Sequence, residues 1–192
     1  MTNKFLSISL IISISYSLSS ANTTITKEEK QQVKQIAVKV LKGFKKTFKP
    51  TLQNILHKMP ANEAIKMCTF NKAVDKYSKS LPKGESLRRI TSKPRNPKHI
   101  AQNEIEKEAL KQIEKTRKPV IKKINQNHYQ FYKPIIVKKA CLKCHGSIKD
   151  IGKNNLKLLR KSYPNGKAIN YKVNDVRGAF VVDIIKDFNV QN

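Results

Sequence analysis

The sequence predicts an α+β protein, with helices in its N-terminal half and strands toward its C-terminus. Residues 26–59 place apolar side chains at intervals of three and four, the period of an amphipathic helix. Residues 129–137 and 178–188 are instead rich in β-branched and aromatic residues, as strands are. A run of helices followed by a run of strands is typical of α+β folds.

The first predicted helix, over 26–59, begins at a capping box formed by Thr26 and Glu29. Its lysine-rich face is expected to be solvated, and we expect Pro50 to break or bend the helix. The opposite face is an apolar stripe that fits packing within the domain and also a homodimer interface. The stripe contains Val33, Ile36, Ala37, Val40, Leu41, Phe44 and Phe48.

A second helix is expected from Pro60 onward, with Asn62 as its N-cap, and it places Met67, Cys68 and Val74 on one inward face. The remaining elements follow from local patterns of apolar, proline and turn residues. We expect a turn at 81–84, a strand at 87–91, an irregular loop at 91–97, a helix at 103–124, a strand at 129–137, a loop at 148–155, a helical turn at 156–160, a turn at 163–166, and strands at 168–173 and 178–188.

The N-terminus predicts export from the cytoplasm. A short basic segment ending at Lys4 precedes an apolar run from Phe5 to Tyr16, and Ser19-Ser20-Ala21 fits a signal-peptide cleavage site. The apolar run is shorter than the roughly 20 residues that a membrane helix needs. We therefore divide the 192 residues into a signal peptide (1–21), an N-terminal helical segment (22–60) and one domain (61–192), and expect the protein in the periplasm.

The formal net charge is +27, and most of the basic residues are lysines. Codon bias in an AT-rich genome, which favours Lys, Ile and Asn, is the main explanation. An acidic redox partner is a second explanation, and peripheral contact with an anionic membrane surface is a third. Because the chain is expected to be secreted, we do not expect nucleic acid as a partner.

One short stretch carries the chemistry, Cys141-Leu142-Lys143-Cys144-His145. Cys-x-x-Cys-His is the attachment signature of a c-type haem. In that interpretation, Cys141 and Cys144 bond to the vinyl groups as thioethers, and His145 ligates the iron from the same side. Gly146 follows and leaves room for the chain to turn away from the haem.

Two other sites fit parts of this motif. Cys-x-x-Cys also occurs in thioredoxin-like dithiols, but those need a βαβ context that is not obvious here. A structural zinc could be held by Cys68, Cys141, Cys144 and His145. Zinc does not require a histidine directly after the second cysteine, so one covalent haem c is the expected cofactor.

The second axial ligand of this haem stays open on chemical grounds, because haem iron accepts thiolate, methionine or histidine. Cys68 is the leading candidate for this ligand. The haem binds the other two cysteines covalently, and an unpaired cysteine in an oxidising compartment usually has a function. We expect Arg95 and Asn96, in the polar loop at 91–97, to bind the haem propionates. The other axial candidates, besides a vacant position, are Met67, Met59, His57, His99 and His128.

Several segments occur together in a set order: Arg88–Pro97, Glu106 with Leu110, Tyr132–Pro134, Cys141–Gly146, Tyr163-Pro164, Ala168, Tyr171 and Asp175–Phe180. In these segments the chain resembles a family of single-haem c-type proteins with a PAS-like fold, long known as a domain of unknown function. Members of that family occur as standalone periplasmic proteins and as sensor modules of bacterial signalling proteins.

This resemblance implies an α+β domain in which helices surround a PAS-like antiparallel sheet, with the N-terminal amphipathic helices packed on it. It also implies one covalent haem held against the sheet, with Cys68 as the axial ligand opposite His145. His99 and Ala101 depart from the family pattern, in which Asn and Pro are expected, and this affects loop geometry more than haem binding.

Two functions remain open from the sequence. The first is an electron-transfer or redox-buffering cytochrome that docks on its partner through lysines. The second is a haem-based redox or gas sensor that signals to a separate protein through ligand exchange at Cys68. No transmitter segment follows Ile185, which favours the carrier slightly. A haem enzyme such as a peroxidase needs an open iron site, which a Cys68 ligand closes, so enzyme activity is not expected.

Overall fold

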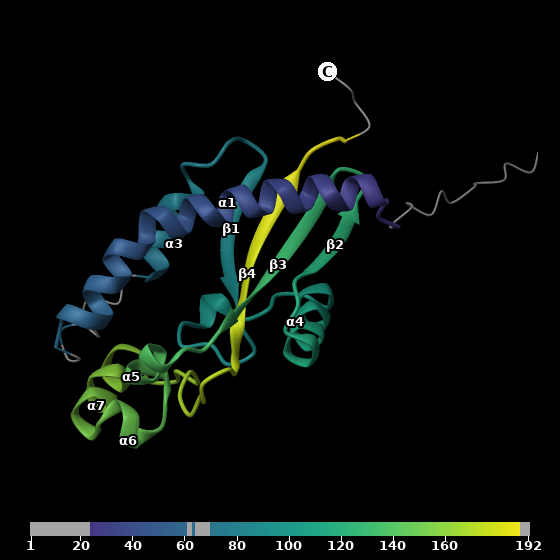
Figure 1. The fold of residues 1–192 in the computed structure, drawn as a ribbon. Helices are drawn as coiled ribbons and strands as arrows, with labels where there is room; N and C mark the ends of the chain where they lie inside the picture. Colours follow the sequence, from purple (N-terminus) through teal and green to yellow (C-terminus); the bar gives the residue numbers. More distant parts are fainter. Residues whose placement is uncertain (1–23, 61–62, 64–69, 189–192) are drawn as a thin grey trace, which may run out of the picture.

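A computed structural model describes residues 24–60, 63 and 70–188 (Figure 1). The predicted signal peptide, Asn62, Met67 and Cys68 lie outside these residues. The helical elements are α1 (Lys27–Gln53), the π-helical turn η1 (Asn54–Lys58), α3 (Phe70–Ser78), the 3-10 turn η2 (Pro97–His99), α4 (Glu104–Thr116), the 3-10 turn η3 (Lys139–Cys141), α5 (Leu142–His145), α6 (Ile148–Ile151) and α7 (Lys153–Ser162). The strands are β1 (Glu85–Ile90), β2 (Val120–Asn125), β3 (His128–Ile136) and β4 (Val176–Ile185). Within this described part of the chain, no helix is both long and apolar enough to cross a bilayer.

The four strands form one antiparallel sheet in the order β1-β4-β3-β2 (Figure 1). Pro134 is tolerated inside β3 because the pairing with β2 ends at Tyr132, which leaves one edge of β3 without a strand partner at the proline. The α+β class and the predicted strands over 87–91, 129–137 and 178–188 are confirmed, with shifted ends.

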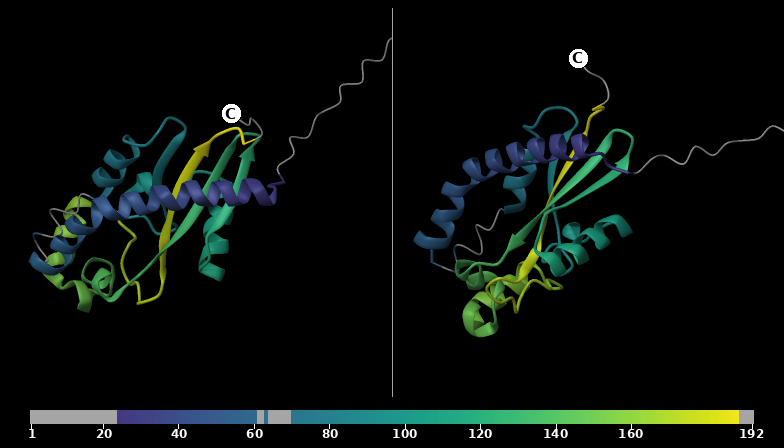
Figure 2. Two further views of the ribbon diagram at one scale, coloured as in Figure 1. Left: turned by 45° about the horizontal axis from the view of Figure 1, so that its top comes forward. Right: turned by 45° about the vertical axis from the view of Figure 1, so that its right-hand side comes forward.

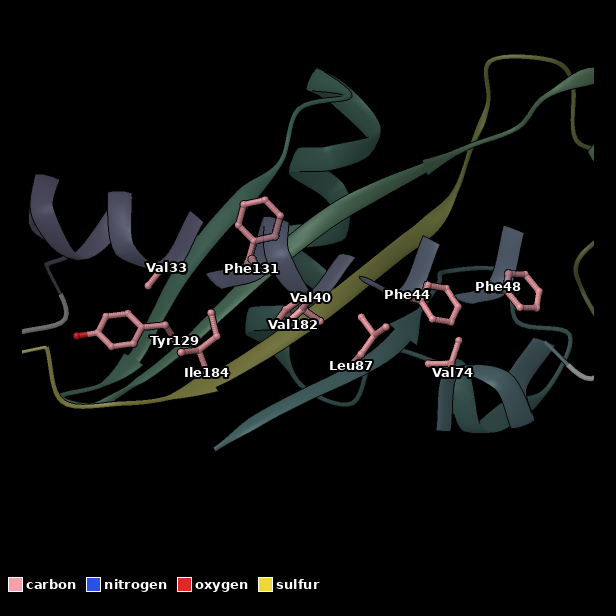
Figure 3. Close-up of a cluster of buried hydrophobic side chains, with 11 residues drawn as sticks. Val33, Val40, Phe44, Phe48, Val74, Leu87, Tyr129, Phe131, Val182 and Ile184 are labelled. Atoms are coloured by element: carbon pink, nitrogen blue, oxygen red, sulfur yellow. The ribbon is translucent and has the colours of Figure 1, made fainter. Parts of the chain in front are cut away.

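Side chains alternate between the two faces of the sheet, and each face has its own core. On β4, Val182 and Ile184 face α1, whereas Ala179 and Val181 face α4. Figure 3 shows the first core, in which Phe44 stacks on Phe48 with ring centroids 5.4 Å apart. The apolar stripe predicted for the first helix therefore packs on the chain's own sheet. This core contains Val33, Ala37, Val40, Phe44, Phe48, Val74, Leu87, Tyr129, Phe131, Val182 and Ile184.

The second face is covered by α4, which packs Ala109, Leu110 and Ile113 against the strands. Figure 2 shows α1 and α4 on different sides of the sheet. A polar network also lies on the α4 face, where the Arg88 guanidinium binds the carboxylates of Glu106 (2.7 Å) and Asp183 (3.0 Å). Each of these charges has a partner, which is the condition for burying them.

The first helix confirms its predicted start. Thr26 Oγ1 accepts a hydrogen bond from the Glu29 N–H, and the Glu29 carboxylate accepts one from the Thr26 N–H. Pro50 does not end the helix, because α1 continues to Gln53. The chain then widens into η1, where the Asn54 N–H is shared between two carbonyl groups of the preceding turn.

The predicted helix over 103–124 is wrong in its second half. α4 ends at Thr116, Arg117 adopts the left-handed conformation (φ 56°), and Val120–Asn125 forms β2 instead. Pro119 cannot donate a helical hydrogen bond, and the free edge of β3 gives the segment after it a strand partner.

Two further predictions, both between β3 and β4, are also wrong. Residues 148–155 are not a loop, because α6 and the first three residues of α7 lie there. The helical turn predicted at 156–160 is part of α7. Residues 168–173 are not a strand, since Asn170 and the nearby Asn174 take positive φ values (61° and 73°) that interrupt an extended chain.

Candidate haem-attachment turn

The Cys-x-x-Cys-His stretch lies in a small lobe, formed by η3, α5, α6 and α7, at one end of the sheet (Figures 1 and 2). β3 delivers the chain to this lobe, and α5 is a single turn that closes at Gly146. A Cβ at Gly146 would lie 2.6 Å from Asp150 Oδ2 and 2.8 Å from the Leu142 carbonyl oxygen, so only glycine fits. That the chain turns away from a haem at Gly146 stays a prediction.

Cys141, Cys144 and His145 are brought together on this turn. Both cysteines are half-buried. Cys141 packs against the cluster of Val137, Ala168 and Tyr171, whereas Cys144 packs against the cluster of Ile151 and Leu159. Each thiol therefore lies beside an apolar cluster, where an apolar ring attached to it would find apolar neighbours.

The imidazole of His145 is oriented by a backbone carbonyl group. Nδ1 of His145 lies 3.0 Å from the carbonyl oxygen of Ala168, so Nδ1–H donates to that oxygen. This hydrogen bond places the proton on Nδ1 and leaves the Nε2 lone pair available. A histidine that donates one ring N–H to a carbonyl is the usual arrangement of a metal-binding imidazole.

Arg95 supports the same turn from the loop after β1. Its guanidinium donates to the carbonyl oxygens of Cys144 and Ala168, the latter at 3.0 Å, and lies 3.2 Å from Nδ1 of His145. Because Nδ1 already donates to Ala168, Arg95 acts on that shared carbonyl and brings a positive charge beside the ring. Desolvation and the positive charges of Arg95, Arg177 and Arg89 hold the pKa of His145 well below its ordinary value. The ring is therefore neutral at pH 7, which is the form that binds a metal.

The segment at 167–174 holds the turn through its backbone. The N–H groups of Asn170 and Tyr171 donate to the carbonyl oxygens of Gly146 (2.8 Å) and His145 (2.9 Å). The Tyr171 ring lies edge-on to the His145 ring, with centroids 6.2 Å apart, and carries Arg177 on one face at 5.3 Å. The irregular shape of this segment is what allows it to follow the turn rather than a strand.

The other predicted site residues are distributed differently. Arg95 contacts the His145 turn, whereas Asn96 caps η2 and lines a separate cavity. Their binding to the haem propionates stays a prediction. His99 lines that cavity too, and His128 is bound to Asp183 at 3.2 Å. Cys68 and Met67 lie outside the described residues, as does the side chain of His57.

Two supports of the site were missed in the sequence. The Ala168 carbonyl group gives no side-chain signal, so only the fold reveals its contact with His145. Arg177 is buried and donates to Thr91 Oγ1 at 3.0 Å, while Thr91 Oγ1 donates to the Arg177 carbonyl at 2.8 Å. Ala168 and Arg177 both fall in segments that carry the family resemblance. The sequence gives no other sign of their importance.

The donor set contains the atoms that a haem needs. Cys68, the fourth ligand of the zinc alternative, lies outside the described residues, so the structure does not test that alternative. Two cysteines three residues apart on one turn, followed by an imidazole with Nε2 available, match the atoms that a c-type haem requires. The apolar clusters beside both thiols meet the remaining need, which is an apolar surface for the ring.

Fold and site together define a class: an α+β protein with a four-stranded antiparallel sheet that ends in a helical lobe carrying a Cys-x-x-Cys-His turn. A model of the Tll0287-like family matches residues 19–184, so the chain belongs to that family. The chain is also similar in fold to a solved structure, the cyanobacterial heme-protein Tll0287. That match has a TM-score of 0.60 and 18% identity, and covers 88% of this chain and 99% of the other. No curated protein matches the chain.

Proposed function

We propose that this protein is a mono-haem c-type cytochrome of the periplasm that transfers or buffers electrons. The observation that carries the proposal is the His145 turn, where Nδ1 donates to the Ala168 carbonyl oxygen at 3.0 Å and leaves Nε2 for iron. Cys141 and Cys144 lie on the same turn and supply the two thioether sulfurs. The related solved protein is described as a heme protein, which supports the cofactor assignment.

When bound, the haem supplies a one-electron redox centre, and the chain's own residues set its surroundings. Ala168 and Arg95 orient the imidazole from one side, and the backbone of Tyr171 fixes the turn from the other. Arg95 and Arg177 add positive charge near the ring, which favours the reduced form of a bound iron over the oxidised form.

The PAS-like form of the fold and the second axial ligand are parts of this proposal. We propose Cys68 opposite His145, because the family resemblance implies a cysteine there and thiolate is a known ligand of haem iron. Covalent attachment requires maturation in an oxidising compartment, which agrees with the apolar N-terminal segment and supports the periplasm.

The attachment test is mass spectrometry of the denatured protein after production in the periplasm of a host with c-type maturation machinery. The wild-type chain should carry one haem that survives denaturation, and the Cys141→Ala, Cys144→Ala double variant should carry none. Cys68→Ala is the matched control, since it removes a cysteine without removing a thioether. It should retain the haem but change the ferric absorption spectrum. A wild-type chain without haem would overturn the proposal.

We further propose that the partner is acidic and docks on the α5–α7 lobe. Between residues 138 and 172, Asp150 is the one carboxylate, and it is occupied by hydrogen bonds from Ser147 (2.6 and 2.8 Å). A positive surface beside the redox centre would steer an acidic protein toward it. The exposed lysines of this segment are Lys138, Lys139, Lys143, Lys149, Lys153, Lys157, Lys161, Lys167 and Lys172.

Two measurements test this role. Reversing four lobe lysines (Lys143, Lys149, Lys153 and Lys157 to Glu) should slow reduction by an acidic ferredoxin at low salt at least tenfold. Reversing four lysines in the N-terminal part of α1 (Lys27, Lys30, Lys34 and Lys39 to Glu) gives the same charge change at the end of the molecule away from the lobe (Figure 1) and should have a much smaller effect. Equal effects would refute lobe docking. Carbon monoxide binding to the reduced haem would instead support the sensor function.

A further inference from the structure

The outer face of α1 carries a row of lysines that the proposed function does not use. The helix is 27 residues long and therefore extends for about 40 Å along one side of the molecule (Figure 2). Five lysines follow one another along it at spacings of seven, eight, three and four residues. At about 100° per residue, these spacings place them within an arc of about 80°, on the side opposite the core stripe. This lysine row consists of Lys27, Lys34, Lys42, Lys45 and Lys49.

The exposed surface of α1 is polar throughout and almost entirely basic. All eight lysines of the helix are exposed. Of its two carboxylates, Glu28 is exposed, whereas Glu29 is buried and bound to Lys123. The ion pairs among the described residues include none of the lysines of α1. The other exposed residues of the helix are glutamine, threonine and proline, so this face offers positive charge without an apolar anchor.

The other amphipathic helix on the sheet, α4, has a balanced exposed face. Its lysines alternate with glutamates, and Lys107 pairs with Glu104 at 2.6 Å. Codon bias acts on both helices alike, so it does not explain why only α1 lacks the compensating carboxylates. The exposed charged residues of α4 are Lys107, Lys111 and Lys115 with Glu104, Glu108 and Glu114.

We propose that the lysine row of α1 docks on an anionic phospholipid surface. A plane of phosphate groups can meet all five ammonium groups at once along the length of the helix, and each lysine held near such a surface adds about fivefold to the affinity. The apolar stripe of α1 already packs on the sheet, so the helix rests on the lipid headgroups and does not insert. The haem takes no part in this contact, which therefore goes beyond the proposed function.

An acidic protein is a better partner for the lobe than for α1. Ile148 of α6 is 51% exposed, and it gives the lysine-rich lobe an apolar contact of the kind found at the centre of protein interfaces. The exposed face of α1 has no such side chain. A surface that binds through charge alone, in an extended row, fits a lipid plane.

Co-sedimentation of the full haem-loaded chain with lipid vesicles tests the proposal. Vesicles of equal parts phosphatidylglycerol and phosphatidylcholine should bind the chain, and pure phosphatidylcholine vesicles should not. Binding should weaken as salt is added, because the lysines are exposed to solvent. Changing Lys34, Lys42, Lys45 and Lys49 to Gln should weaken it about a hundredfold or more. Lysine and glutamine have similar helix propensities, so the change preserves the helix.

The matched control removes the same charge from the α4 side of the molecule, where Lys107, Lys111, Lys115 and Lys118 are changed to Gln. It should weaken vesicle binding by less than about tenfold, since these lysines face away from the docked surface. Equal losses in the two variants would show that net charge binds the vesicles, and equal binding to both kinds of vesicle would show that anionic lipid is not recognised. Either result overturns the proposal.

A second measurement keeps the test valid if the α1 variant fails to fold. Acetylation of the wild-type lysines, followed by mass spectrometry, should be slowed by anionic vesicles along the lysine row and unchanged on α4. If vesicles leave the row unprotected, while an acidic ferredoxin protects it, the row is a protein-docking surface and the lipid proposal is wrong. Haem content is measured separately, so a chain without haem refutes the proposed function and leaves the lipid test intact.

Discussion

Glu29 ties the start of α1 to the sheet, and its replacement by Gln tests how much this contact contributes to stability. The carboxylate accepts hydrogen bonds from the Tyr129 hydroxyl (2.5 Å), the Lys123 ammonium (2.8 Å) and the Thr26 N–H (2.8 Å). Desolvation opposes ionisation here, but these hydrogen bonds outweigh it and lower the pKa of Glu29 from 4.5 to about 2.

The size of the effect follows from that pKa. At about 1.4 kcal/mol per pH unit, the lowering corresponds to about 3 kcal/mol of stability at neutral pH. Gln also leaves Lys123, whose side chain is 9% exposed, without its carboxylate partner. Because the contact lies at the start of α1, water can hydrogen-bond to the groups that lose Glu29, and this reduces the loss of stability. We therefore expect Glu29→Gln to lower the free energy of unfolding by about 2 to 3 kcal/mol at pH 7.

Urea unfolding followed by circular dichroism measures this change. Glu28→Gln is the matched control, since Glu28 is exposed in the same first turn. The folded pKa lies below the unfolded one, so the stabilisation is complete above about pH 4.5 and is lost as the pH falls toward 2. The gap between wild type and Glu29→Gln should therefore narrow between pH 6 and pH 3. An equal cost for both variants at pH 6, or a gap independent of pH, would refute the reasoning.

Three further variants test the core, the sheet edge and the site. Phe44→Ala should cost about 3 to 5 kcal/mol of unfolding free energy in urea, because Phe44 is 5% exposed at the centre of the α1 core. Gly178→Ala should cost at least about 2 kcal/mol in the same assay, since φ is +142° and a Cβ would lie 2.2 Å from the Ile90 carbonyl oxygen. Arg95→Gln should lower the midpoint potential of the proposed haem, because it removes a positive charge beside His145; spectroelectrochemistry measures this, and an unchanged or higher potential would contradict it.

Local patterns in the sequence predicted the elements whose shape depends on their own residues. The capping box at Thr26 and the period of the apolar stripe are sufficient to place α1, and the alternation of β3 and β4 is sufficient to place both strands. The segment at 120–125 failed for a different reason. Its residues continue a helical pattern, and only the free edge of β3 turns them into a strand. Whether residues 120–125 form a helix or a strand therefore depends on pairing with β3, which the pattern of these residues alone does not show.

The candidate site was predictable in its chemistry but not in its support. The Cys141–His145 stretch predicts haem attachment by itself, because the thioether sulfurs and the iron ligand of a c-type haem follow that spacing. Nothing in the stretch indicates that Ala168 orients the imidazole or that Arg95 binds the same carbonyl group. These contacts join segments 23 to 73 residues apart, so they appear only once the sheet has set the two loops side by side.

The cluster of Thr91, Tyr171 and Arg177 explains how the sheet reaches the site. Arg177 and Thr91 exchange hydrogen bonds at the junction where β1 ends and β4 begins, and Gly178 allows the two backbones to approach there. Arg177 also lies against the Tyr171 ring, whose backbone N–H holds the His145 carbonyl group. Pairing of β1 with β4 therefore sets the position of the segment that orients His145. It follows that the imidazole can be fixed by folding of the sheet before any ring is attached, as preorganised metal ligands require.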